Sequence, residues 1–145
     1  MKKYIPILIV PVINGCSMFP ETKEELIRTG NQSQKYCISA ERSVVEPRIE
    51  AYLSKCFRPS YVSVGNGTGF INNQTLSKSQ ENDKTEFSVS VPSGTGAGYF
   101  LNVVVTDGEA NCKTEMSATA YNFMWERNFS KLLESANGGH PWCPM

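Results

Sequence analysis

The sequence predicts an α+β domain, with an antiparallel sheet of about five or six strands and two amphipathic helices packed on one face. Two patterns lead to this prediction. Between residues 60 and 121, apolar residues recur with a period of two, which is typical of half-buried strands. Before and after this region they recur with the helical period of about 3.6 residues. The predicted order is therefore strand, helix, meander of strands, helix.

The first predicted helix has an apolar stripe at positions i, i+4, i+7, i+8 and i+11. Its members are Val45, Ile49, Tyr52, Leu53 and Cys56. Ser43 and Glu46 form a capping-box pattern near its start. Pro47 favours the first helical turn, so the onset is expected between Ala40 and Glu46. Pro59 ends the helix, because a proline cannot continue it.

Short strands are predicted before this helix and between the two helices. They lie at 35–39, 61–64, from 70 onwards, at 86–91, at 100–106 and at 112–120. The segment 100–106 is apolar on both faces, which predicts a central strand covered on each side. Glycine-rich turns are expected at 65–69 and 92–98, whereas 72–84 is polar and loop-like in its second half.

The second predicted helix repeats the same apolar spacing. Its members are Trp125, Phe129, Leu132, Leu133 and Ala136. Asn137, Gly138 and Gly139 supply its C-terminal stop, and a short irregular tail follows. Over residues 35–137 this order resembles a helix-grip or similar sheet-and-helix domain. The resemblance is one of topology without a motif, so it implies no site.

The N-terminus has the layout of a secretory signal. Lys2 and Lys3 precede a mostly apolar run over residues 4–13, which is too short to span a bilayer as a helix. Such a signal directs a protein out of the cytoplasm and is removed from the mature chain.

The end of this signal, residues 13–16, reads Ile-Asn-Gly-Cys and resembles the lipobox of bacterial lipoproteins. The resemblance implies diacylglycerol on Cys16, cleavage after Gly15, and acylation of the new amine, commonly by palmitate. Ser17, standing where an aspartate would affect sorting, implies the outer membrane of a Gram-negative cell, with the domain facing the periplasm. The alternative is an ordinary cleaved signal with Cys16 as an unpaired thiol.

These patterns divide the chain into a signal over 1–15, a lipid-anchored tether over 16–34 and a single α+β domain over 35–145. Within the tether, Thr22 and Glu25 form a capping-box pattern that predicts one short helix. The end of the tether has no periodicity and is expected to be flexible, so that the domain stands clear of the lipid headgroups.

The charge balance gives no electrostatic footprint for nucleic acid. The chain has 14 basic and 14 acidic residues, and its net charge without the two lysines of the signal is −2. Proteins that bind nucleic acid or anionic membranes carry basic patches instead. No second apolar run approaches the ~20 residues of a transmembrane helix. The lipid on Cys16 is therefore the expected membrane contact.

Five cysteines in an exported chain predict disulfides, and four remain when Cys16 is set aside. Cys37 and Cys56 flank the first helix, which separates them by roughly 15–25 Å. A disulfide allows only about 7 Å between Cα atoms, so this pair is disfavoured. The favoured bridges are Cys56 with Cys143, at the ends of two helices, and Cys37 with Cys112, on two strands. The other pairings stay open.

No motif predicts catalysis, a metal or a cofactor. The single histidine, His140, lies in a Gly- and Pro-rich tail that supports a catalytic base poorly. No closely spaced Cys/His set predicts zinc. The glycine patterns at 65–69 and 94–98 match no phosphate-binding loop and are expected to be turns. Glu46 and Glu50 are expected on a solvated helix face.

Aromatic residues around the second helix are the strongest indication of a binding surface. Trp125 and Phe129 are expected to pack on the sheet. Tyr121, Phe123 and Trp142 form a candidate contact patch. The expected function is a non-catalytic interaction or assembly module that binds another envelope protein. The alternative is a carrier of a small apolar ligand between sheet and helices, with a cavity lined by Phe87, Val89, Leu101, Val103 and Leu132.

Overall fold

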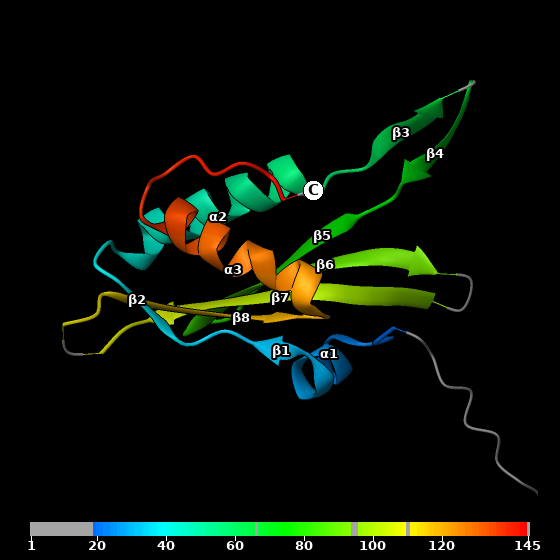
Figure 1. The fold of residues 1–145 in the computed structure, drawn as a ribbon. Coiled ribbons are helices and arrows are strands. Elements are labelled where there is room, and N and C mark those ends of the chain that lie inside the picture. The colour runs from blue at the N-terminus through cyan, green and yellow to red at the C-terminus, as the bar shows by residue number, and fades with distance from the viewer. Residues whose placement is uncertain (1–18, 66, 94–95, 110, 145) are drawn as a thin grey trace, which may run out of the picture.

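The computed structural model describes residues 19–65, 67–93, 96–109 and 111–144 (Figure 1). The fold is α+β with a six-stranded antiparallel sheet, as predicted. The helices are α1 (Lys23–Thr29), α2 (Arg42–Cys56) and α3 (Phe123–Ala136). The strands are β1 (Asn31–Gln32), β2 (Tyr36–Ile38), β3 (Ser60–Gly65), β4 (Thr68–Asn72), β5 (Thr75–Gln80), β6 (Lys84–Ser93), β7 (Gly96–Asp107) and β8 (Thr114–Ala120). No helix formed by the described residues is long and apolar enough to cross a membrane.

Strand β7 lies near the centre of the sheet. The order is β1–β8–β7–β6–β5, and β2 pairs with β8 as well. β1 places Asn31 opposite Ala120, and β2 places Ile38 opposite Thr114, so the two short strands share one edge of β8. β5 forms the opposite edge of the sheet. Strands β3 and β4 pair only with each other among the described residues.

Helices α2 and α3 cover one face of the sheet, and α1 lies against the other (Figure 1). The apolar core fills the space between the sheet and the two long helices. Its fully buried members are Ile38, Val45, Ile49, Leu53, Phe87, Val89, Leu101, Val103, Val105, Ala120, Leu132 and Ala136. Both predicted helical stripes contribute to this core, which confirms the two predicted helices.

The sheet face under α1 is polar and nevertheless buried. Ser88 of β6 donates a hydrogen bond of 2.8 Å from Oγ to Asn102 Oδ1 of β7, and both side chains are almost fully buried. Lys23 of α1 forms an ion pair with Glu86 of β6, and Leu26 is fully buried. The central strand β7 is therefore covered on both faces, as predicted. On the face under α1, hydrogen bonds satisfy the buried polar groups.

Residues 19–34 pack on the domain, so the prediction of a tether is wrong for this part of the chain. Thr22 Oγ1 accepts a hydrogen bond of 3.1 Å from the Glu25 amide, which confirms the predicted capped helix. The stretch expected to be flexible instead contains β1, and the Ser33 amide donates to Ala118 O at 2.8 Å. A two-residue strand carries no periodicity, which is why the pattern missed it. Residues 16–18 lie outside the described residues.

The start of α2 differs from the predicted capping box. The N-cap is Glu41, whose side chain makes no capping hydrogen bond. Glu46 accepts hydrogen bonds from Arg42 Nε at 2.6 Å and from Thr85 Oγ1 at 2.7 Å. Burial alone would raise the pKa of Glu46, but these hydrogen bonds and the positive charge of Arg42 lower it. Glu46 is therefore a buried link between α2 and β6, and the prediction of a solvated position is wrong.

Strand β5 occupies part of the segment expected to be loop-like. It pairs with β6 along its whole length, from Thr75 opposite Ser90 to Gln80 opposite Thr85. Most of its side chains are exposed and polar. An edge strand with two polar faces lacks the apolar alternation from which strands are predicted, so the sequence pattern did not reveal it.

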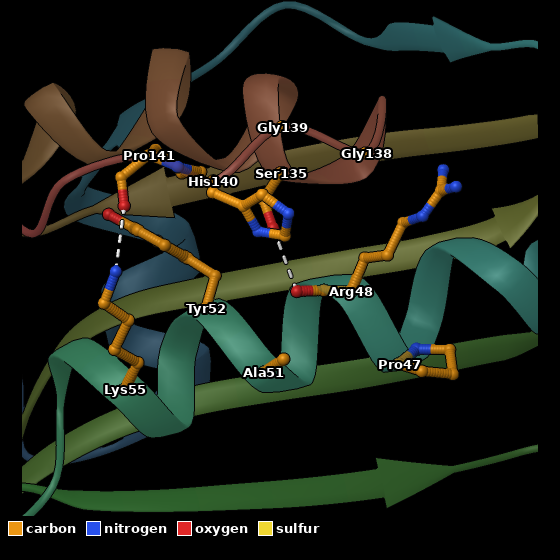
Figure 2. A pocket seen from close by; sticks show the side chains of 10 residues that line it. All are labelled: Pro47, Arg48, Ala51, Tyr52, Lys55, Ser135, Gly138, Gly139, His140 and Pro141. Atoms are coloured by element: carbon orange, nitrogen blue, oxygen red, sulfur yellow. Dashed lines mark hydrogen bonds between the residues drawn. The ribbon is translucent and has the colours of Figure 1, made fainter.

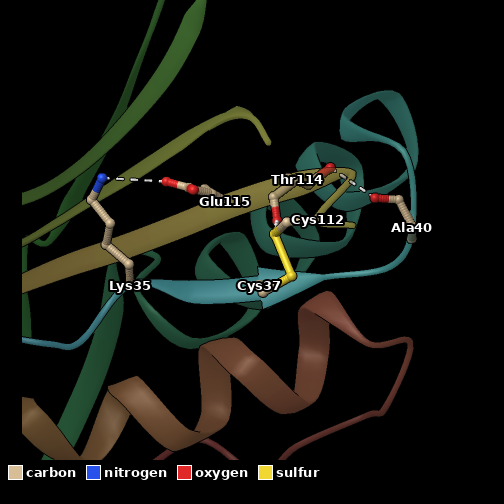
Figure 3. Close-up of a disulfide and its surroundings, with 6 residues drawn as sticks. All are labelled: Lys35, Cys37, Ala40, Cys112, Thr114 and Glu115. Carbon is tan, nitrogen blue, oxygen red and sulfur yellow. Dashed lines mark hydrogen bonds and ion pairs between the residues drawn. A yellow bond between two sulfur atoms is a disulfide. The ribbon is translucent and has the colours of Figure 1, made fainter. Parts of the chain in front are cut away.

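Two disulfides join distant segments, and they are the two pairs favoured from the sequence. Cys37 of β2 is bonded to Cys112 in the loop before β8, with Cα atoms 5.3 Å apart (Figure 3). Cys56 at the end of α2 is bonded to Cys143 in the C-terminal tail, also with 5.3 Å between Cα atoms. Beside the first bridge, Thr114 Oγ1 donates a hydrogen bond of 2.7 Å to a carbonyl in the loop before α2.

Candidate functional site

The β3–β4 hairpin projects from the body of the domain (Figure 1). It is an antiparallel two-stranded sheet whose turn carries Gly65 and Gly67, both with positive φ, as expected for these glycines. Within the described residues it shares no strand pairing with the six-stranded sheet. Two-stranded hairpins are marginally stable by themselves in water, so the pairing of β3 with β4 alone gives this hairpin little stability.

Two large apolar side chains of the hairpin face solvent as a pair. Tyr61 of β3 lies directly opposite Ile71 of β4, and their relative exposures are 65% and 64%. Side chains opposite each other on an antiparallel pair share one face and lie close enough to touch. Tyr61 and Ile71 therefore form one exposed apolar surface near the base of the projecting hairpin, which we call the hairpin surface.

The sequence of the hairpin carries no charge. No acidic, basic or histidine residue occurs from Pro59 to Ser77, although charged residues make up 19% of the chain. Solvent-exposed strands commonly carry lysine or other charges that prevent contact with other proteins. The hairpin surface lacks this protection, so nothing in its charge opposes contact with an apolar partner.

The residues of the predicted contact patch have different environments. Phe123 and Trp142 are exposed, at 69% and 85%. Tyr121 is only partly exposed, because its ring packs against those of Phe19 and Phe100, with centroids 5.4 and 5.5 Å away. Phe123 begins α3 and Trp142 lies in the tail, and no ring contact joins these two in the described part of the chain. Met124, beside Phe123, is exposed as well.

A row of aromatic rings fixes this end of the domain. Trp125 stacks between Phe57, at 5.3 Å between centroids, and Phe100, at 5.2 Å. Phe100 in turn contacts Phe19 at 5.4 Å. The row joins the segment before α1 to the end of the sheet, to α3 and to the residue that follows α2. The expected packing of Trp125 on the sheet is confirmed. The contacts of Phe19 with Phe100 and Tyr121 were not anticipated from the sequence.

A solvent-open groove of about 330 Å³ lies between α2 and the C-terminal tail (Figure 2). It is lined by Pro47, Arg48, Ala51, Tyr52, Lys55, Ser135, Gly138, Gly139, His140 and Pro141. Arg48 Nη1 donates to Ala136 O at 3.0 Å, and Lys55 Nζ donates to Pro141 O at 3.4 Å. The groove therefore has basic side chains whose partners are neutral carbonyls.

The groove holds no arrangement for general acid–base catalysis. Tyr52 Oη donates to Asn128 Oδ1 at 2.8 Å, and burial raises the pKa of Tyr52, with a smaller effect from the charge of Glu134. Tyr52 therefore stays a neutral hydrogen-bond donor. His140 is exposed in the tail and makes no hydrogen bond to a nucleophile among the described residues. The described residues also contain no group of three or more His, Cys, Asp or Glu side chains that could hold a metal ion.

The space between sheet and helices is filled by side chains. The five residues expected to line a ligand cavity there, Phe87, Val89, Leu101, Val103 and Leu132, have no exposed surface and belong to one packed cluster. Four of the best-formed pockets among the described residues are lined by other side chains. An apolar ligand therefore has no room at the predicted position.

Comparison with known proteins returns no relative: no protein family, no curated protein and no solved structure matches this chain.

Proposed function

We propose that this protein is a lipid-anchored cell-envelope protein whose domain binds another envelope protein without catalysing a reaction. The observation that carries the proposal is the hairpin surface, formed by Tyr61 and Ile71 on an uncharged projecting hairpin. It is apolar, lies outside the core and has no counterpart within the described chain that covers it.

The chemistry of the hairpin surface fits a protein partner with an uncharged apolar patch. Burying a tyrosine or isoleucine side chain is worth roughly 1.5–3 kcal/mol, and tyrosines are frequent among the residues that dominate interface energies. Phe123, Met124 and Trp142 offer further apolar area outside the core. Depletion of charge at the centre of such a surface is the usual composition of an interface core.

The anchor belongs to the same proposal. Residues 13–16 resemble a lipobox, which supports acylation of Cys16, and Ser17 supports sorting to the outer membrane. Two disulfides suit an oxidising compartment such as the periplasm. Anchoring holds the domain near other envelope proteins and raises their effective concentration, so a modest interface is sufficient for binding.

A carrier of a small apolar ligand is not supported at the position expected from the sequence. That role requires a cavity between the sheet and the helices, and the five residues in question are packed together. An interaction module requires a filled core with apolar residues exposed elsewhere, and this is the arrangement that the described residues have.

Site-specific photocrosslinking in native cells tests the proposal. A photoreactive amino acid at position 71 is expected to form a discrete adduct with one envelope protein. The same probe at position 44 is the matched control, because Val44 is also an exposed apolar residue, 43% exposed, but lies in the first turn of α2. Equal adducts from both positions, or none from position 71, would contradict the proposed docking surface.

The intact mass of the protein from detergent-extracted membranes tests the anchor separately. We expect loss of residues 1–15, added acyl chains, and four thiols that react with an alkylating agent only after reduction. A soluble, unacylated protein would contradict the lipid anchor. The docking surface would then be tested by the crosslinking experiment alone.

A further inference from the structure

We infer that the groove between α2 and the C-terminal tail binds a small organic anion, with a carboxylate or similar head and a compact apolar body. This site lies apart from the hairpin surface and does not depend on the protein partner or on the lipid anchor.

The first support is unbalanced charge. Most basic side chains of the described chain form an ion pair with a glutamate or aspartate. These basic residues are Lys23, Lys35, Arg42, Lys78, Lys84, Lys113 and Lys131. Arg48 and Lys55 form no ion pair with any described residue, and both line the groove. Arg48 uses Nη1 on Ala136 O, which leaves other guanidinium N–H groups for a ligand.

No carboxylate lines the groove to neutralise this charge. Glu134 lies behind Gly139 and is paired with Lys131 at 3.5 Å. An anion in the groove would therefore pair these cations with an opposite charge, which the neutral carbonyl groups do not supply, through further hydrogen bonds from their free N–H groups. Figure 2 shows Arg48 and Lys55 toward the two ends of the groove, with His140 of the tail between them.

The second support is the apolar lining between the basic groups. Pro47 and Ala51 of α2 and Pro141 of the tail line the groove together with Tyr52. The hydroxyl group of Tyr52 is already bonded to Asn128, so Tyr52 adds no free polar donor. The volume of about 330 Å³ is at the small end of ligand sites, which span roughly 300–1,000 Å³. It suits a molecule with a single ring or a short alkyl chain.

The third support is that the tail is fixed over α2. The Cys56–Cys143 disulfide ties the far end of the tail to the end of α2. At the near end, Gly138 has φ +91°, and a Cβ there would lie 3.3 Å from the Arg48 guanidinium carbon. A glycine at this position therefore lets the tail lie directly against Arg48. A groove whose two walls are fixed in advance loses little entropy when a ligand binds.

Amide NMR of the full protein, in the form in which it is purified from its native cells, tests the inference. The probes are benzoate and its uncharged analogue benzamide. Benzoate is expected to give saturable shifts at residues 47–55 and 135–141, with roughly tenfold higher affinity than benzamide. Equal affinity for the two probes, or shifts scattered over the surface, would overturn the inference. So would the absence of saturation by benzoate, hexanoate and phenyl phosphate up to about 10 mM.

Three variants make the test specific. Lys55→Gln is expected to weaken benzoate binding roughly three- to tenfold and to leave benzamide unaffected. Ala51→Leu keeps both basic groups but fills the groove from an exposed helical position, and is expected to abolish the saturable shifts. Lys35→Gln removes a lysine that pairs with Glu115 outside the groove, and is the matched control with unchanged affinity. Tight binding by the Ala51→Leu variant would show that the anion binds elsewhere.

Discussion

The six-stranded sheet and the β3–β4 hairpin use similar strand-forming residues in opposite surroundings. In the sheet, Phe87 and Val89 are fully buried under α2 and α3, and the other face is covered by α1. In the hairpin, Tyr61 and Ile71 expose about two thirds of their surface. The sheet residues therefore contribute burial free energy to the stability of the domain, whereas Tyr61 and Ile71 of the hairpin contribute little.

The largest expected effect is in the sheet. Replacement of Phe87 by alanine removes a fully buried ring from the core between sheet and helices and is expected to lower the free energy of unfolding by about 3–5 kcal/mol. Urea denaturation followed by circular dichroism measures this loss. A loss below about 1 kcal/mol would mean that the core is not closely packed at this strand and would remove the contrast with the hairpin.

Loss of the second disulfide is expected to have the next largest effect. The double variant Cys56→Ser, Cys143→Ser should lower the free energy of unfolding by about 2–5 kcal/mol, because the unfolded chain is then less constrained. Denaturant melts under non-reducing conditions test this, with the same variant also expected to bind benzoate more weakly. Unchanged binding would show that the bridge does not help to shape the groove.

The buried carboxylate of Glu46 predicts a smaller, pH-dependent effect on the sheet side. Its folded-state pKa lies below the ordinary value of 4.5, so its contribution is fully present above that value and is lost as pH falls through the folded-state pKa. The Glu46→Gln variant is expected to show a shallower loss of unfolding free energy as pH falls below about 4.5.

The hydrogen bond from Thr85 gives an internal control for this pH dependence. Thr85→Val removes the Oγ1 donor to Glu46 but keeps the carboxylate and the ion pair with Arg42. The folded-state pKa of Glu46 then rises toward its ordinary value of 4.5, so the acid-induced loss of stability should be smaller in total and should be complete at a higher pH than in the wild type, although it begins at the same pH. Identical pH profiles for wild type, Glu46→Gln and Thr85→Val would show that Glu46 does not link α2 to β6 in the manner described.

The smallest expected effect on stability is in the hairpin. The double variant Tyr61→Ser, Ile71→Thr keeps small or β-branched strand residues and alters only exposed side chains, so the unfolding free energy should change by less than about 0.5 kcal/mol. Denaturant melts under the conditions used for the Phe87→Ala variant provide the comparison. A loss comparable to that of the core variant would mean that the hairpin surface is part of the stabilising core.

The elements with strong periodicity were predictable from the sequence. The stripes that begin at Val45 and Trp125 identified α2 and α3, and the apolar segment 100–106 identified the central strand. The length of α2 disfavoured a bridge between Cys37 and Cys56. The observed pairs were then favoured because two of the cysteines were expected at helix ends and two on strands.

Other features leave no repeated pattern in the sequence. The capping box at Thr22 predicted α1, but its packing on the sheet through one buried leucine, Leu26, was not predictable. β1 and β5 are short or polar and were missed. The position of the β3–β4 hairpin outside the sheet depends on strand order, which local patterns do not determine. The groove was missed because it joins α2 to a tail far along the chain. The placement of Arg48 and Lys55 on one face of α2, at i and i+7, was the signal available in the sequence.

Exposure of the aromatic residues was predicted only in part. Phe123 and Trp142 are exposed as expected. Tyr121 instead packs against Phe19, from a segment that was assigned to the tether. The incorrect prediction of a tether and the incorrect expectation for Tyr121 therefore have one cause. The packing of residues 19–34 on the domain determines the environment of Tyr121.

The most direct test of the central claim is the size of the complex extracted from native envelopes in mild detergent, measured for wild type and for Tyr61→Ser, Ile71→Thr. We expect the wild-type protein in a complex larger than the free domain, and the folded variant at the size of the free domain. A complex of unchanged size in the variant would contradict the assignment of the hairpin as the docking element.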